Sequence, residues 1–183
     1  RQRQMCIRDS KYPDMRAWLN IFDTNINYPI VQGIDDAEYL NKNIDGDFSL
    51  AGSIFLSSLC NGDLNEHYSL VYGHHMDNGA MFGDVEKFLD KSFFDSHVDG
   101  ILYTKTDIYD VKVFAVLETD AYNEKIYFPY FANENKDDFY NYLQKNALHI
   151  RDVNRNNKVI TMSTCTESYT NGRIVLFGEL IRR

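Results

Sequence analysis

The chain has 183 residues, 14% of them aromatic, and a formal net charge of −8. That length suits a single domain that buries roughly two thirds of its unfolded surface without disulfides, and the negative charge without a basic stripe disfavours nucleic acid as a partner. The three cysteines show no metal-ligand spacing and no disulfide pattern, and no apolar run is long enough to span a membrane.

The first ten residues, RQRQMCIRDS, are basic and lack apolar periodicity. This composition is typical of a non-native or disordered leader, so residues 1–10 are excluded from the fold prediction. Cys6 is then uninformative about the fold and the function. The rest, 11–183, is predicted to form one catalytic domain. On this interpretation the true N-terminus is missing, and any native anchor or signal is missing with it.

The first predicted element is a helix over 11–22, because Met15, Trp18, Leu19 and Phe22 follow helical spacing. A short β-type run at 26–33 follows, in which Pro29 favours an edge position. The Asp- and Asn-rich residues 34–51 are predicted to be loop. Further strands are expected at 53–57, 68–76, 100–105, 109–119, 158–165 and 173–181, and further helices at 79–90 and 135–148.

This pattern contains seven or eight short strands with two or three helices inserted irregularly between them. Regular alternation of strand and helix, which a doubly wound parallel sheet requires, does not occur. A mainly β fold is therefore predicted, either a mostly antiparallel sheet or a closed barrel decorated by helices.

Chemistry is concentrated in the last predicted hairpin. The strand VITMSTC ends at Cys165, and RIVLFGEL begins at Arg173 after a seven-residue loop rich in turn formers. If the strands pair antiparallel, the two residues face each other with Cβ atoms about 5 Å apart. A guanidinium there stabilises a thiolate or an oxyanion, but it cannot act as a base.

A cysteine nucleophile also needs an acid/base partner, which is usually histidine. His74 and His75 follow Gly73 at the end of an apolar strand, where a scaffold can aim a side chain into a cleft. The other histidines are expected at the surface: His67, His97 and His149.

These segments together resemble the sortase family. TMSTC resembles the sortase signature T-L-x-T-C with Met162 in place of Leu, YGHHM resembles the segment of the sortase histidine, and RIVLFGEL resembles the final strand with the sortase arginine. TNINYPIVQG and NGAMFGDVEKFLD are similar to class B sortases in particular. The resemblance implies a closed β-barrel of seven or eight strands with an N-terminal helix, with Cys165 as nucleophile, His74 as general acid/base and Arg173 as oxyanion or substrate-positioning residue.

The resemblance implies a cysteine transpeptidase without cofactor or metal, held on the outer face of a Gram-positive cell membrane by an N-terminal segment absent from this chain. Such an enzyme cleaves a sorting signal, here expected to resemble N-P-x-T-x or S-P-x-T-G. It then joins the new threonine carboxyl to a peptidoglycan amine. His75 would direct its side chain elsewhere.

Three further residues are candidates for substrate binding. Ser163 shares a strand face with Cys165 and could bond the substrate backbone, or be an ordinary strand serine. Glu167 could orient Arg173 or be a solvated loop carboxylate. Tyr122, with its neighbours Tyr127 and Tyr130, could line a peptide groove or simply pack on the surface.

Three alternatives remain open from the sequence. A cysteine hydrolase would use the same residues with water as the acceptor, and a pilin-polymerising sortase would use a pilin amine. A non-enzymatic wall-binding domain would instead bury Cys165. Cys60, after a predicted strand, is expected to be chemically inert.

Overall fold

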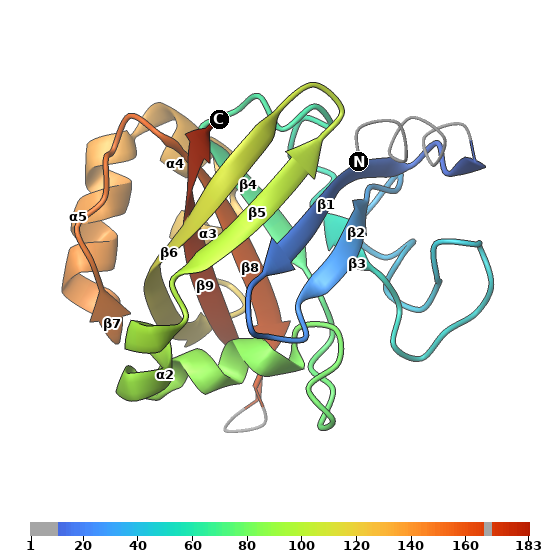
Figure 1. Cartoon of the computed structure of the whole chain (residues 1–183), viewed down its shortest axis with the longest axis horizontal. Helices are drawn as coiled ribbons and strands as arrows, with labels where there is room; N and C mark the ends of the chain where they lie inside the picture. Colours follow the sequence, from blue (N-terminus) through green and yellow to red (C-terminus); the bar gives the residue numbers. More distant parts are fainter. Residues whose placement is uncertain (1–10, 167–169) are drawn as a thin grey trace.

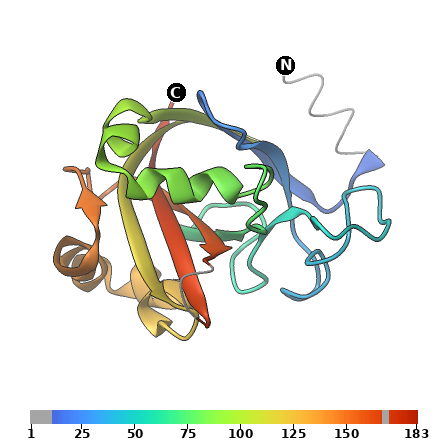
Figure 2. The same cartoon turned by 90° about the horizontal axis from the view of Figure 1, so that it is seen from below.

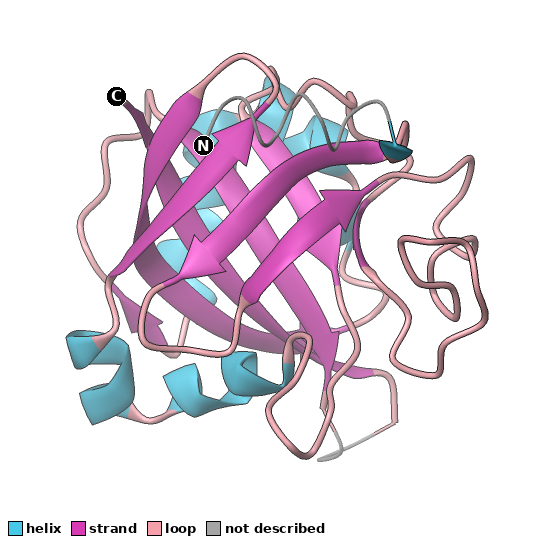
Figure 3. Cartoon of the chain, turned by 45° about the vertical axis from the view of Figure 1, so that its right-hand side comes forward, coloured by secondary structure: helices cyan, strands magenta, loops and turns pink. Residues whose placement is uncertain are grey.

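The computed structural model describes residues 11–166 and 170–183. Within them, nine strands form one sheet in the order β5-β1-β2-β3-β4-β8-β9-β6-β7, and a further pairing of β5 with β6 closes eight strands into a barrel (Figure 1, Figure 3). The strands are β1 Met15–Ile21, β2 Asn27–Val31, β3 Ile54–Leu56, β4 Tyr68–Tyr72, β5 Asp99–Thr104, β6 Ile108–Asp120, β7 His149–Ile150, β8 Lys158–Cys165 and β9 Gly172–Arg182. The mainly β, closed-barrel prediction is confirmed.

The N-terminal helix predicted over 11–22 is wrong, because Met15–Ile21 forms strand β1. Burial alternates along this strand: Met15, Ala17, Leu19 and Ile21 are buried. Trp18 points to the other face and donates from Nε1 to Oδ1 of Asn27 at 2.7 Å. A short segment can match both periods, and here pairing with β2 and β5 on either side decides for the strand.

In the described part of the chain, five helical segments lie between the strands: η1 Gly83–Leu89, α2 Lys91–Ser96, α3 Glu124–Tyr127, α4 Pro129–Glu134 and α5 Lys136–Asn146. The first is a 3₁₀ helix where an α-helix was expected. The helix predicted at 135–148 is confirmed as α5, with Asn135 at its N-cap position. Helices α3 and α4 and strand β7 were not predicted. No helix in the described part of the chain is both long and apolar enough to cross a membrane.

Helices α3, α4 and α5 pack on the outside of the barrel (Figure 1). Tyr68 of β4, fully buried, donates its hydroxyl to the carbonyl of Ile126 at 2.9 Å. The ring of Phe139 on α5 lies 6.1 Å from the ring of Phe177 on β9, and this contact joins the helix to the strand. These three helices, which connect β6 to β7, are therefore packed against strands that also carry the candidate site.

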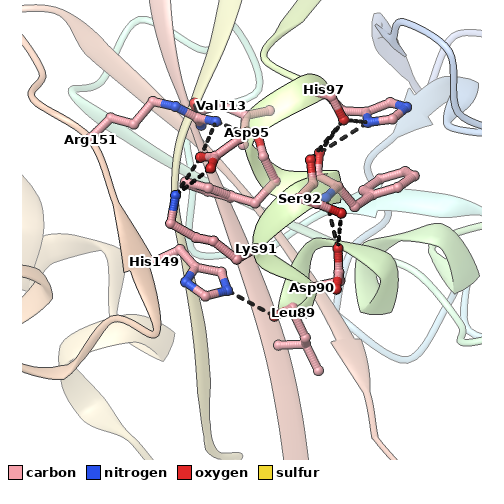
Figure 4. A network of polar contacts seen from close by, with 12 residues as sticks. Leu89, Asp90, Lys91, Ser92, Asp95, His97, Val113, His149 and Arg151 are labelled. Atoms are coloured by element: carbon pink, nitrogen blue, oxygen red, sulfur yellow. Dashed lines mark hydrogen bonds and ion pairs between the residues drawn. The ribbon is translucent and has the colours of Figure 1, made fainter.

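Helices η1 and α2 lie across one end of the barrel (Figure 2) and are fastened to it by a polar network (Figure 4). Arg151 donates to the carbonyl oxygens of Val113, at 2.9 Å, and Phe94. Its guanidinium also lies 3.9 Å from the centre of the Phe94 ring. His149 contacts the carbonyl of Leu89 through Nε2 at 2.8 Å. One cation and one imidazole thus connect η1 and α2 to β6 and β7.

Replacing Arg151 by methionine should destabilise the fold, because the backbone carbonyl oxygens of the buried Phe94 and Val113 lose their hydrogen bonds from the guanidinium. Leaving buried acceptors unsatisfied costs about 1–3 kcal/mol of unfolding free energy, which urea denaturation measures. The matched control is Arg155→Met, because Arg155 pairs at 3.3 Å with Asp137, whose side chain is 86% exposed. An exposed pair contributes at most about 1 kcal/mol. Equal midpoints for the two variants would contradict the anchoring role of Arg151.

Candidate active site

Three candidate residues lie at the same edge of three neighbouring strands. Strand β8 pairs in parallel with β4, ending at Tyr72 opposite Ser163, and antiparallel with β9, ending at Cys165 opposite Arg173. The Gly73 N–H continues the first ladder by donating to the Ser163 carbonyl at 3.1 Å.

His74 stands two positions beyond Tyr72, as Cys165 stands two positions beyond Ser163. The last pair of the first ladder is Tyr72 with Ser163, so the chain carrying His74 leaves β4 beside the strand that ends at Cys165, and Arg173 pairs with Cys165 on the other side. Strand pairing therefore places next to one another the strand ends that carry these residues, which span 74 to 173 of the chain.

Cys165 is exposed at the end of its strand, whereas Cys60 is buried. Burial raises the pKa of the Cys60 thiol to about 12, and the Cys60 sulfur accepts the Leu70 N–H at 3.4 Å. Cys60 thus has the inert environment expected of it. The exposure of Cys165 rules out the wall-binding alternative in which this cysteine is a buried core residue.

The two adjacent histidines have different partners. His74 contacts the backbone carbonyl of Leu40 through Nε2 at 2.6 Å. His75 contacts Glu86 of η1 through Nε2 at 2.8 Å, and its Nδ1 lies 4.0 Å from Asp77. The contact of the His75 ring with Glu86 holds the loop after β4 against η1. His75 is thereby directed toward η1, which leaves His74 as the histidine at the Cys165 edge.

Arg173 is half-buried at the start of β9, between Cys165 of β8 and Thr119 of β6. Its Nη1 donates to the carbonyl of Gly172 at 2.8 Å. This position supplies a permanent cation beside the thiol, which is the electrostatic feature that a thiolate or an oxyanion requires.

Ser163 is buried on the same strand face as Cys165, and its Oγ lies 2.9 Å from the hydroxyl of Tyr127. The Tyr127 ring stacks on Tyr72 with centroids 6.2 Å apart and planes 7° apart. A serine and two tyrosines therefore adjoin the row of His74, Cys165 and Arg173. Sequence reasoning missed Tyr72, although its place at the end of an apolar strand, two residues before His74, was a usable signal.

The remaining candidates for substrate binding differ in position. Tyr122 is 77% exposed in the turn after β6, where the neighbouring Ala121 N–H donates to the Asn171 carbonyl at 2.9 Å. Glu167 lies outside the described residues. Among the described residues, no group of three or more His, Cys, Asp or Glu side chains is placed to hold a metal ion.

Comparison with known proteins matches this geometry to one family. A family model described as the sortase domain matches residues 19–181. Sortase B of Listeria monocytogenes is 36% identical over 179 residues, in a match that covers 93% of this chain and 71% of the relative. Sortase B of Staphylococcus aureus is 27% identical over 173 residues, in a match that covers 92% of this chain and 71% of the relative.

Solved structures agree with the sequence matches. A class B sortase of Streptococcus pyogenes involved in pilus biogenesis has a TM-score of 0.88 at 34% identity, covering 97% of both chains. A Staphylococcus aureus sortase B–substrate complex has a TM-score of 0.88 at 26% identity, covering 99% of this chain and 86% of the other. The chain belongs to the sortase family of cysteine transpeptidases, and among sortases it is of class B.

Proposed function

We propose that this sortase cleaves a C-terminal sorting signal with Cys165 as nucleophile, His74 as general acid/base and Arg173 as oxyanion partner, and joins the product to a peptidoglycan amine. The observation that supports the proposal is the strand pairing: Cys165 at the end of β8 is opposite Arg173 of β9, and His74 follows the end of β4, the parallel neighbour of β8. A nucleophile, a proton carrier and a permanent cation at one sheet edge are the three groups that acyl transfer through a thioester needs.

In the first half-reaction, the Cys165 thiol gives its proton to His74, and the sulfur attacks the threonine carbonyl of the signal. Arg173 and nearby backbone N–H groups stabilise the oxyanion of the tetrahedral intermediate. The carbon–nitrogen bond then breaks as His74 gives its proton to the leaving amine, and a thioester remains on Cys165.

In the second half-reaction, an incoming amine attacks the thioester. His74 removes a proton from that amine, and the carbon–sulfur bond breaks to return the Cys165 sulfur. The net change exchanges one amide bond for another, so no cofactor, oxidant or reductant is consumed.

For the substrate, we propose a signal resembling N-P-x-T-x or S-P-x-T-G. Sortases act on sorting signals, and a related Staphylococcus aureus sortase B has been solved as a substrate complex. In this chain, Ser163 and the stacked Tyr72 and Tyr127 adjoin the row of candidate catalytic residues and are proposed to contact the peptide. Tyr122 and Glu167 are proposed as outer contacts.

The acceptor has two candidates. A peptidoglycan amine is the acceptor for wall anchoring, which is the role that we favour for a class B sortase. A pilin amine is the second candidate, because the Streptococcus pyogenes relative is a class B sortase involved in pilus biogenesis. Both are primary amines, and the same half-reactions serve either.

Sortases are cell-surface enzymes of Gram-positive bacteria. We propose that this one works on the outer face of the cell membrane, held there by an N-terminal segment outside the chain described here. Secreted proteins that carry a sorting signal, and wall precursors with a free amine, are both available at that location.

Incubating the protein with a small library of sorting peptides and candidate amines should yield a peptide–amine conjugate. Mass spectrometry then identifies the cleaved signal and separates transfer from hydrolysis. Cys165→Ala should yield neither product, and Cys60→Ala should behave as wild type. Release of free acid alone in the presence of every amine would instead favour the hydrolase alternative.

The two histidines allow a matched test of the acid/base role. His74→Gln keeps side-chain size and hydrogen bonding but cannot carry a transferable proton, so kcat/KM for a fluorogenic sorting peptide should fall by about 10²- to 10⁴-fold. His75→Gln retains a donor toward Glu86 and should keep most activity. The reverse pattern of losses would assign the role to His75.

Arg173→Lys retains the charge but loses the planar fork of the guanidinium. We expect kcat/KM to fall about a hundredfold, which is comparable with the loss of one oxyanion donor. Arg182→Lys is the control, because Arg182 lies at the other end of β9 and pairs with Asp107 at 2.5 Å. An unchanged rate in Arg173→Lys would remove the guanidinium from the mechanism.

A further inference from the structure

The loop between β2 and β3 contacts the candidate acid/base directly. The carbonyl oxygen of Leu40 lies 2.6 Å from Nε2 of His74, although the two residues are separated by 34 positions in the chain. A carbonyl oxygen can only accept a hydrogen bond. The Nε2 atom must therefore be the donor, and a neutral His74 ring has its lone pair on Nδ1.

Tyr39, the residue before Leu40, is held in place by its side chain. Tyr39 is 4% exposed and packs in a small apolar cluster with Val31 and Phe55, against which Tyr72 of β4 also lies. The Tyr39 hydroxyl donates to Asp14 at 2.6 Å.

The backbone on both sides of Tyr39 is bonded as well. The Ser53 N–H donates to the Tyr39 carbonyl at 3.0 Å, and the Leu40 N–H donates to the Ala37 carbonyl at 3.2 Å. The carbonyl that meets His74 is thus part of a built loop whose side chains and backbone both hold it in place.

Gly52 packs closely against the backbone of Tyr39 and Leu40. Gly52 has a φ of +59°, and a Cβ added to it would lie 2.3 Å from the Leu40 oxygen and 2.8 Å from the Tyr39 oxygen. Real Cβ atoms do not come that close to backbone, so any larger residue at position 52 must displace the Leu40 carbonyl. Gly52 therefore sets the position of the group that meets His74.

We propose that the backbone carbonyl of Leu40 is a positioning group for His74, holding its ring in the Nε2–H tautomer and orientation that makes Nδ1 the proton-transfer atom. In the charged state the same carbonyl accepts a charge-assisted bond from the imidazolium that forms when His74 takes a proton. This is the part that a carboxylate plays beside the histidine of hydrolase triads. The inference rests on the proposed function, because it takes His74 as the acid/base.

The first test measures the wild-type protein. With ¹⁵N-labelled histidine, assigned by the signal that is lost in a folded His74→Gln variant, we expect the neutral His74 ring to carry its proton on Nε2. That proton should be visible as a slowly exchanging signal, because a hydrogen bond protects it from water. A neutral His74 ring with the proton on Nδ1 overturns the proposal, and this outcome does not depend on any substrate being known.

The second test compares two glycines of the same loop. Gly46 also has a positive φ, +93°, but a Cβ added there would meet no described atom within 4 Å. Gly52→Ala and Gly46→Ala both place an L residue at positive φ, and the φ of Gly46 lies further from the left-handed region that such residues can adopt. Backbone strain therefore does not favour Gly46→Ala, and only Gly52→Ala brings a Cβ against the Leu40 carbonyl.

In the Gly52→Ala variant, the slowly exchanging Nε2–H signal should disappear and kcat/KM for a sorting peptide should fall about tenfold to a hundredfold, the effect of a misplacement of about 1 Å. Gly46→Ala should keep both, and circular dichroism checks that each variant is folded. Retention of signal and rate in Gly52→Ala, or equal losses in Gly46→Ala, overturns the proposal. Absence of peptide cleavage in the wild type would instead refute the proposed function and leave the Nε2–H measurement standing.

Discussion

The pairing of β8 with β4 on one side and β9 on the other is the constraint on which the site depends. Parallel strands end at the same edge of a sheet, and an antiparallel neighbour begins where its partner ends. Cys165 at the end of β8 therefore meets the residues that follow β4 and the first residues of β9. A slip of one residue in either ladder would turn the partner side chain to the opposite face and separate the three groups.

The surroundings of this edge keep the two histidines apart. Gly73 precedes them at a point where a Cβ would lie 2.5 Å from the Ile54 side chain and 2.6 Å from the Phe82 ring, so a larger residue there would push these two side chains aside. His75 then bonds Glu86 of η1, while His74 meets the Leu40 carbonyl. The network around Arg151 holds η1 and α2 on the barrel. One end of the barrel thereby supports the loop that carries the candidate acid/base.

The sequence predicted the long strands well, because their apolar residues are continuous or alternate over many positions, as in β6, β8 and β9. It failed for residues 11–22, where Met15 and Leu19 satisfy both a helical and a strand period. Only hydrogen bonding to β2 and β5 distinguishes the two, and no local feature of the segment records that pairing. The short helices α3 and α4 were missed for a similar reason, since neither has the length to show a period.

In the candidate site, too, local contacts could be predicted from the sequence and long-range contacts could not. Cys165 and Arg173 belong to one hairpin, so their neighbourhood follows from local sequence, turn residues and strand register. His74 lies about ninety residues away, and only its resemblance to a family segment linked it to them before the fold was known. Tyr72 stacking on Tyr127, and Leu40 meeting His74, are contacts between distant segments. The sequence by itself determined the chemical groups and the local hairpin. The tertiary structure alone decided which loop carbonyl and which aromatic rings surround them, because those contacts depend on how the closed barrel brings non-adjacent chain segments together.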